Sequence, residues 1–177
     1  MKKPDIEFTK AWWLRTIHDP VKLSAWLQKL QRTELAGYVD HIEYMRGKTL
    51  PNRTAKILTN IAMDELTHSN MIIDLMGERN IPVDPDGVHS TYWDTVLASV
   101  SNIDEYCAAN YYGEALASYR FEIILDMKET PSDIAEVISK ALPDEIFHRQ
   151  TLYKLAGDEA LLKVRAYHNA ALESIIK

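Results

Sequence analysis

The sequence contains a single cysteine, Cys107, among its 177 residues. An internal disulfide, a cysteine-rich zinc site and a paired Cys-x-x-Cys motif are therefore excluded. Cations are also in the minority: 20 Lys and Arg face 26 Asp and Glu, for a net charge of −6. This balance argues against a broad phosphate-binding surface, and we do not expect a nucleic-acid partner.

Long apolar runs are missing as well. No stretch approaches the roughly 20 consecutive apolar residues that a transmembrane helix needs, and the N-terminal "MKKPDIEFTK" lacks the apolar run of a signal peptide. We therefore expect a cytoplasmic protein without a membrane span. With 46% hydrophobic and 26% charged residues, the chain is typical of one globular domain, residues 1–177, with a core of its own.

Glycine is scarce, with six residues in the chain, and apolar residues recur at spacings of three and four. Both features predict an all-α fold with long helices. The first should run over 21–46 and end at Gly47, and the second should start at "LPNR" (50–53) and run to about residue 76, before Gly77. The capping signals "SNID" (101–104) and "TPSD" (130–133) should open the third and fourth, which end near residues 127 and 157.

The remaining segments connect or flank these four helices. A short N-terminal helix should contain Trp12 and Trp13, and a short C-terminal helix should follow residue 157. Residues 78–100 begin with a run rich in Pro, Asp and Gly and then carry the capping signal "TYWD" (91–94), which indicates a long crossover with a short helix in it. Two helix pairs joined by one long crossover describe a four-helix bundle.

The chain also contains an internal repeat. A gapless shift of 80 residues superposes residues at helix starts, at helix ends and at polar positions within the helices. The pairs include Pro51 with Pro131, Gly77 with Gly157, Glu34 with Glu114, and "DELTH" (64–68) with "DEIFH" (144–148). The repeat predicts a duplicated helical hairpin over about 21–77 and 101–157.

Each of the four long helices carries a carboxylate on its apolar stripe. Glu65 and His68 are three residues apart and share a helix face with Leu58, Ile61 and Ile72. The other stripes are centred on Glu34, on Glu114 and on Glu145 with His148. Few Lys or Arg residues fall on these stripes, and burying several carboxylates without compensation costs several kcal/mol each.

Two divalent cations would neutralise these four carboxylates. A Glu on one helix with Glu-x-x-His on the next, repeated, is the ligand set of a carboxylate-bridged dinuclear site. The spacing supports this pairing, because 31 residues separate Glu34 from Glu65 and again Glu114 from Glu145. Oxygen ligands with one imidazole per metal favour two iron ions, with manganese as the alternative.

The pattern Glu34, Glu65-x-x-His68, Glu114, Glu145-x-x-His148 resembles the ferritin-like di-iron carboxylate superfamily, over about residues 20–157. The resemblance implies that Glu65 and Glu145 bridge the metals and that Glu34 and Glu114 bind mainly one each. It also implies that Asp64 and Asp144 accept hydrogen bonds from the ligand histidines. The segments "DELTHSNMIIDLMGERNIP" and "EALASYRF" are loosely similar to the ferritin-like tRNA hydroxylases, and bacterioferritin has comparable Asp-Glu-x-x-His segments.

Several further residues have two interpretations. Tyr38 and His41 follow Glu34 on its face and are either groups next to the metals or core residues with satisfied polar tips. Cys107 is expected to be a buried apolar residue. Pro143 should kink its helix or open a local gap in the backbone. The histidines outside the motif are expected at the surface: His18, His89 and His168.

Three classes of function remain open at this point. The favoured class is a di-iron oxidase or oxygenase that uses O2 to oxidise a small apolar organic substrate, because aromatic and aliphatic residues line the helix faces near the motif. The alternatives are a ferroxidase or iron-storage protein of the bacterioferritin type and a non-catalytic helical binding module. No nucleotide-binding glycine motif occurs, so electrons should come from a separate reductase. The oligomeric state is open, a homodimer included.

Overall fold

The computed structural model describes residues 4–84, 91–98 and 100–176, and these residues form six helices and no strand. The all-α prediction is therefore confirmed for the described part of the chain. The helices fall into two compact units. The small unit is Arg15–His89, and the large unit comprises Met1–Leu14 and Ser90–Lys177. Within the described ranges, no helix combines the length and the apolar character needed to cross a bilayer.

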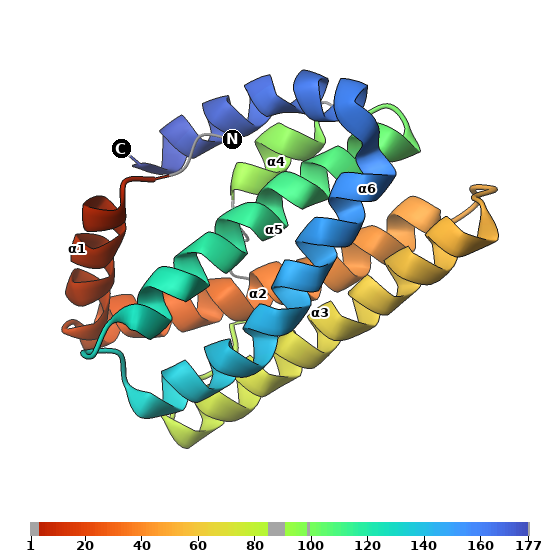
Figure 1. Ribbon diagram of the computed structural model, residues 1–177. Coiled ribbons are helices and arrows are strands. Elements are labelled where there is room, and N and C mark those ends of the chain that lie inside the picture. The colour runs from red at the N-terminus through yellow and green to blue at the C-terminus, as the bar shows by residue number, and fades with distance from the viewer. Residues whose placement is uncertain (1–3, 85–90, 99, 177) are drawn as a thin grey trace. The chain divides into compact units, whose positions relative to one another are not determined.

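The small unit is a helical hairpin of α2 (Pro20–Met45) and α3 (Asn52–Glu78), which lie side by side in Figure 1. Asp19 caps α2, because its side chain accepts hydrogen bonds from the backbone amides of Val21 and Lys22. Gly47 follows the end of α2 with a φ of 70°, a conformation that glycine adopts without steric cost. The predicted first helix and its glycine stop are confirmed.

The end of α3 differs from the prediction by two residues. The helix continues through Gly77 to Glu78, and the left-handed residue that follows it is Asn80, with a φ of 56°. Asparagine tolerates this conformation because its short polar side chain can bond to the local backbone. The turn is closed by the amide of Ile81, which donates to the carbonyl of Met76.

The large unit contains α4 (Thr91–Leu97), α5 (Ile103–Asp126), α6 (Ser132–Ile176) and most of α1 (Ile6–Ile17). In α1 the buried indole of Trp13 donates to the Thr130 hydroxyl at 2.8 Å, and Thr130 in turn donates to the carbonyl of Ile124. The prediction that Thr130 caps the following helix is wrong, because its hydroxyl joins α1 to the end of α5. The predicted short helix of the crossover is present as α4, whereas residues 85–90 and 99, His89 among them, lie outside the described residues.

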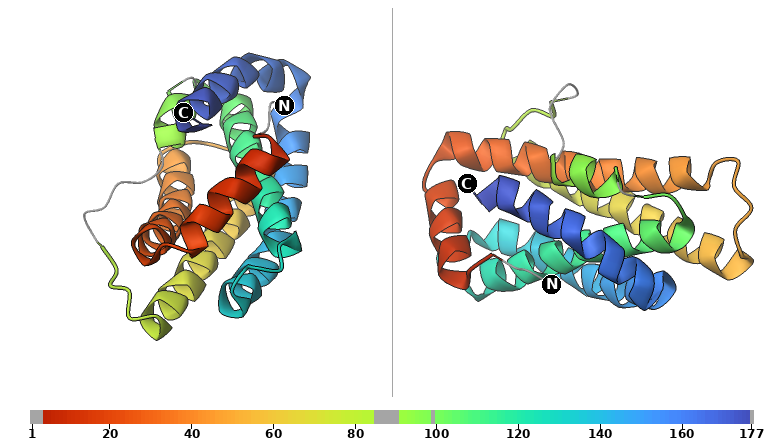
Figure 2. Two further views of the ribbon diagram at one scale, coloured as in Figure 1. Left: turned by 90° about the vertical axis from the view of Figure 1, so that its left-hand side faces the viewer. Right: turned by 90° about the horizontal axis from the view of Figure 1, so that it is seen from above.

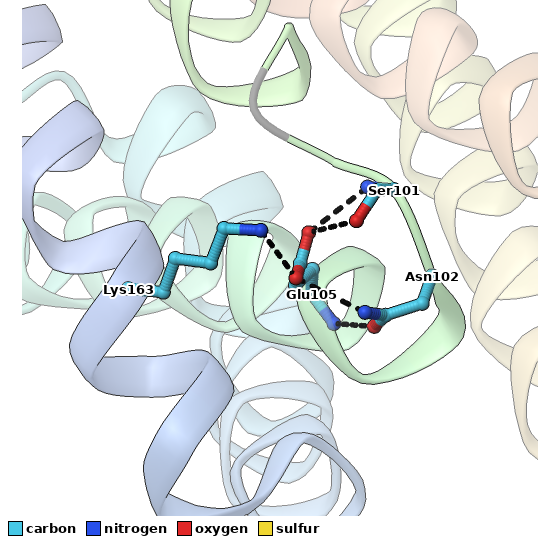
Figure 3. A network of polar contacts seen from close by, with 4 residues as sticks. All are labelled: Ser101, Asn102, Glu105 and Lys163. Carbon is cyan, nitrogen blue, oxygen red and sulfur yellow. Dashed lines mark hydrogen bonds and ion pairs between the residues drawn. The ribbon is translucent and has the colours of Figure 1, made fainter.

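The start of α5 is capped one residue later than "SNID" suggests. The N-cap is Asn102, whose side-chain oxygen accepts from the Glu105 amide, and Glu105 Oε1 accepts from Asn102 Nδ2 at 3.0 Å. Glu105 Oε2 also accepts from the amide and the hydroxyl of Ser101, and Lys163 of α6 lies 2.6 Å from Oε1 (Figure 3). This network ties the start of α5 to the C-terminal part of α6.

The long helix α6 consists of two segments that meet at Gly157. Gly157 has φ 71° and ψ 163°, and the ribbon bends sharply between its lighter and darker blue parts in Figures 1 and 2. The predicted break at Gly157 and the separate C-terminal segment are therefore confirmed. Pro143 lies inside α6 and does not interrupt the helix. The non-helical dihedral angles within α6 are those of Gly157.

The burial pattern repeats along the two hairpins with the same offset of 80 residues as the sequence. Residues buried at equivalent places are Leu27 and Cys107, Glu34 and Glu114, His41 and Phe121, Leu58 and Ile138, Ile61 and Ala141, Glu65 and Glu145, His68 and His148, Ile72 and Leu152, and Met76 and Ala156. The apolar stripes that the sequence predicts are thus the buried faces of their helices. The arrangement of both hairpins as one ferritin-like bundle, and as a single domain, stays a prediction.

Candidate metal-binding site

The small unit brings Glu34, Glu65 and His68 together, and we call these three residues the small-unit trio. Each is at most 6% exposed. One ligand atom from each lies within 4.8 Å of those of the other two. Glu34 Oε2 of α2 is 3.5 Å from His68 Nδ1 of α3. Two carboxylates and one imidazole therefore converge inside one helical hairpin.

A glycine gives the Glu65 carboxylate its place against α2. A Cβ atom at Gly37 would lie 3.1 Å from Glu65 Oε2, closer than ordinary van der Waals contact. The sequence pattern did not single out Gly37, although a glycine in the middle of a long helix is costly and suggests a packing reason. The residue at the equivalent position of the second hairpin is Ala117, so the two hairpins differ here.

Two further contacts hold α2 and α3 near the small-unit trio. The buried Gln31 donates from Nε2 to the Ser69 hydroxyl at 3.0 Å, which joins the residue one turn before Glu34 to the residue after His68. The buried His41 lies with Nδ1 3.0 Å from the carbonyl of Gly37, so Nδ1 carries the proton and donates. One ring nitrogen of His41 is therefore hydrogen-bonded within α2, and both of its interpretations, as a core residue and as a group next to a metal, stay predictions.

The large unit repeats the arrangement with Glu114, Glu145 and His148, the large-unit trio. Glu114 comes from α5, and the other two come from α6. Their exposures are 7%, 2% and 0%, and their ligand atoms also lie within 4.8 Å of one another. Both Glu-x-x-His motifs are therefore buried and close to the glutamate with which the sequence pairs them.

Aromatic residues of α4 cover α5 beside Glu114. The Trp93 ring lies over Gly113, where a Cβ atom would overlap Trp93 Cη2. Tyr92 is buried and packs edge-on against Trp93 at 5.4 Å between ring centroids. Burial, followed by the negative charge of Glu114, raises the pKa of the Tyr92 phenol well above its ordinary value. The phenol therefore stays protonated at neutral pH.

The Tyr92 hydroxyl contacts a histidine that sequence reasoning placed wrongly. His168 is 0% exposed, and its Nδ1 lies 2.7 Å from the Tyr92 hydroxyl. The surface assignment of His168 is therefore wrong, whereas His18 is exposed as expected. The signal was available, because His168 continues the apolar stripe of Leu161, Val164 and Leu172 at helical spacing.

A surface pocket of about 260 Å³ lies beside the large-unit trio and is lined by Tyr111, Arg149, Gln150, Tyr153 and Lys154. Tyr111 and Arg149 occupy the positions equivalent to Gln31 and Ser69 of the other hairpin. Where the small unit has a buried hydrogen bond, the large unit therefore has a hollow. Arg149 follows His148 in the chain and donates to the buried Ser118 hydroxyl at 3.1 Å.

The remaining candidates lie around the trios. Asp64, Asp144 and Tyr38 are half-buried, and their roles next to metal ligands stay predictions. Cys107 is 0% exposed, and burial raises the pKa of its thiol to about 12. This agrees with the expected apolar role of Cys107, because a thiol that stays protonated is a poor nucleophile.

The donor sets fit a divalent metal. Two ligands of one ion lie at most about 4.4 Å apart, twice a typical metal–oxygen distance of about 2.2 Å. Donors gathered within 4.8 Å therefore need only small side-chain shifts to bind one ion. Each trio contains two carboxylates, so one divalent ion neutralises its charge. Oxygen with imidazole suits iron, manganese or zinc, and the donors do not identify the metal.

Comparisons with known proteins add no family to this description. The chain matches no protein-family model, and neither the curated proteins nor the solved structures gave a match.

Proposed function

We propose that this chain is a non-haem di-iron oxidase or oxygenase that uses O2 to oxidise a small apolar organic substrate. The observation that carries the proposal is the repeated buried trio, Glu34, Glu65 and His68 in one hairpin and Glu114, Glu145 and His148 in the other. Two such trios supply four carboxylates and two imidazoles, which balance the charge of two Fe(II) ions. This is the ligand set of the carboxylate-bridged di-iron proteins.

In this proposal the six residues would hold two ions, with Glu65 and Glu145 in the bridging roles that the resemblance implies and the other four residues each binding mainly one ion. The reduced iron pair, when bound, supplies the electrons that activate O2. Gly37 leaves room for the Glu65 carboxylate, and the Gln31–Ser69 hydrogen bond holds both helices of the small-unit trio in register. Trp93 covers the backbone beside Glu114, which shields the large-unit trio on that side from water. A separate reductase supplies the electrons.

An apolar environment supports an organic substrate over iron as the substrate. The residues buried on the same faces as the ligands include Leu58, Ile61 and Ile72 in the small unit and Ile138 and Leu152 in the large unit. An iron-storage protein needs carboxylates that guide further iron ions inward. Within the described residues, one buried carboxylate lies outside the trios. It is that of Glu105, which pairs with Lys163.

The test is an anaerobic Fe(II) titration of the metal-free protein, followed by a pulse of O2 and a count of iron per chain. We expect saturation at about two irons per chain and no further uptake after oxidation. Glu65→Ala and Glu145→Ala should each lose the pair, whereas Glu122→Ala removes an exposed charge from α5 and should bind as the wild type does. Continued uptake would instead indicate a ferroxidase. Two tightly bound irons in either ligand variant would contradict the bridging roles.

A further inference from the structure

We propose that Tyr92 and His168 form a one-electron, one-proton redox site next to the large-unit trio. The Tyr92 hydroxyl lies 2.7 Å from His168 Nδ1, and both residues are buried. A phenol gives up an electron far more readily when its proton moves at the same time to a base within hydrogen-bond distance. An imidazole nitrogen is such a base near neutral pH.

The neighbouring tyrosine shows why Tyr92 is the redox-active one. Tyr112 stacks on the His168 ring at 4.7 Å between centroids and 19° between planes, but its hydroxyl donates to the backbone carbonyl of Leu161 at 2.8 Å. A backbone carbonyl accepts a hydrogen bond but does not take up a proton at neutral pH. Of the two phenols that touch His168, Tyr92 therefore has a base for its proton, and Tyr112 positions the imidazole.

The surroundings connect Tyr92 to the trio. Trp93 lies over Gly113, the residue before Glu114, and its ring meets Tyr92 edge-on. The charge of Glu114 adds to burial in raising the pKa of the Tyr92 phenol, and the half-buried Arg120 lowers it. Through Trp93, Tyr92 therefore lies beside the part of α5 that carries Glu114, which suits one-electron transfer between the phenol and a metal held by the trio.

The Tyr92 O–H bond breaks, its electron passes to a one-electron oxidant, and its proton passes to His168 Nδ1. A neutral phenoxyl radical and an imidazolium remain. Iron held by the six proposed ligands would supply this oxidant when O2 is present, so this assignment rests on the proposed function. An external one-electron donor restores the phenol, and the proton returns to it. The Tyr92–His168 pair thus holds one oxidising equivalent when no substrate is bound.

The first experiment needs no iron. The metal-free protein is photo-oxidised with a ruthenium polypyridyl sensitiser and persulfate, and radicals are followed by electron paramagnetic resonance, with ring-deuterated tyrosine to assign the signal. We expect a long-lived phenoxyl radical that is absent from Tyr92→Phe and still forms in Tyr112→Phe, which keeps the ring that stacks on His168. His168→Gln keeps a hydrogen-bond acceptor without its basicity, and it should slow radical formation about 100-fold or more. Circular dichroism checks that each variant is folded.

A radical that persists in Tyr92→Phe, or forms at the wild-type rate in His168→Gln, would overturn the redox site. The second experiment adds Fe(II) and O2 to the wild type and to Tyr92→Phe. A phenoxyl radical in the wild type alone, with iron oxidised in both, supports the iron pair as oxidant. Oxidation of bound iron without a radical refutes that role. If the chain binds no iron pair, the proposed function fails, and the photo-oxidation result alone decides the redox site.

Discussion

The Glu65 carboxylate lies against the bare Cα of Gly37, where a methyl group would come within 3.1 Å of Oε2. Gly37→Ala should therefore push Glu65 by a few tenths of an ångström and weaken metal binding by roughly tenfold, as changes around metal ligands commonly do. Because alanine favours a helix over glycine by about 0.5–1 kcal/mol, the metal-free variant should be no less stable than the wild type. Calorimetric titration with Mn(II) and thermal unfolding measure the two effects.

Two variants control for helix propensity. Gly77→Ala places its methyl group in open space on α3 and should leave metal affinity unchanged. Ala117→Gly makes the reverse change at the equivalent position of α5 and should cost stability without weakening metal binding. Equal affinities in Gly37→Ala and the wild type would show that the Glu65 carboxylate does not depend on this contact.

Replacement of the two proposed bridging carboxylates should separate metal binding from stability. In Glu65→Gln/Glu145→Gln, neutral amides replace two buried charges, so the metal-free variant should unfold at a temperature no lower than that of the wild type. A metal at 100 times its dissociation constant stabilises a binding-competent protein by about 2.7 kcal/mol. Only the wild type and the surface control Glu122→Gln should show this gain in thermal unfolding with Mn(II). An equal gain in the double variant would place the metal elsewhere.

Lys163 and Glu105 should make stability depend on pH in the acid range. The hydrogen bond from Lys163, together with those from Ser101, lowers the pKa of Glu105 from 4.5 to about 2. The stabilisation is therefore fully present above pH 4.5 and is lost as the pH falls towards about 2. Lys163→Met should lower the unfolding temperature at neutral pH and flatten its dependence on pH in this window. Lys140→Met, which breaks an exposed ion pair with Glu136, should leave both nearly unchanged.

The contact between Gly113 and Trp93 should respond to added volume. A Cβ atom at position 113 would overlap the Trp93 ring, so Gly113→Ala should destabilise the protein by about 1–3 kcal/mol, as overpacking does. Denaturation by urea measures the loss. If the ring is the cause, Gly113→Ala should cost little in a Trp93→Leu background, where the overlapping atoms are gone. An equal cost in both backgrounds would assign the effect to α5 alone.

Residues that end or cap helices made the helix bounds predictable from the sequence. Gly47 and Gly157 have positive φ angles, and each ends a helical segment where the sequence indicates. The errors arose where either of two nearby residues could cap or end the helix. Ser101 and Asn102 both fit a capping box, and Glu105 at the third position selects Asn102. At the end of α3, the left-handed residue is Asn80 and not Gly77. Glycine and asparagine can both close such a turn, so the residue type alone does not identify the position.

The trios were predictable because charge on an apolar stripe is rare, and because the repeat gave the same residues twice. The surroundings were not. His168 has no partner histidine or glutamate in the sequence pattern, and its bond to Tyr92 joins residues 76 positions apart. Gly37 likewise acts through an approach between helices that helical periodicity does not describe. Such contacts depend on which helix faces pack together, and the sequence does not specify this pairing locally.

Gly157 divides α6 into two segments with different duties. The part before it carries Glu145 and His148, and the part after it carries Lys163 and His168. A chain that ended at this glycine would keep all six proposed metal ligands, yet it would lose the partner of Glu105 and the base beside Tyr92. The proposed metal ligands and the proposed redox pair therefore depend on different segments of α6, so a truncation after Gly157 would remove the second and keep the first.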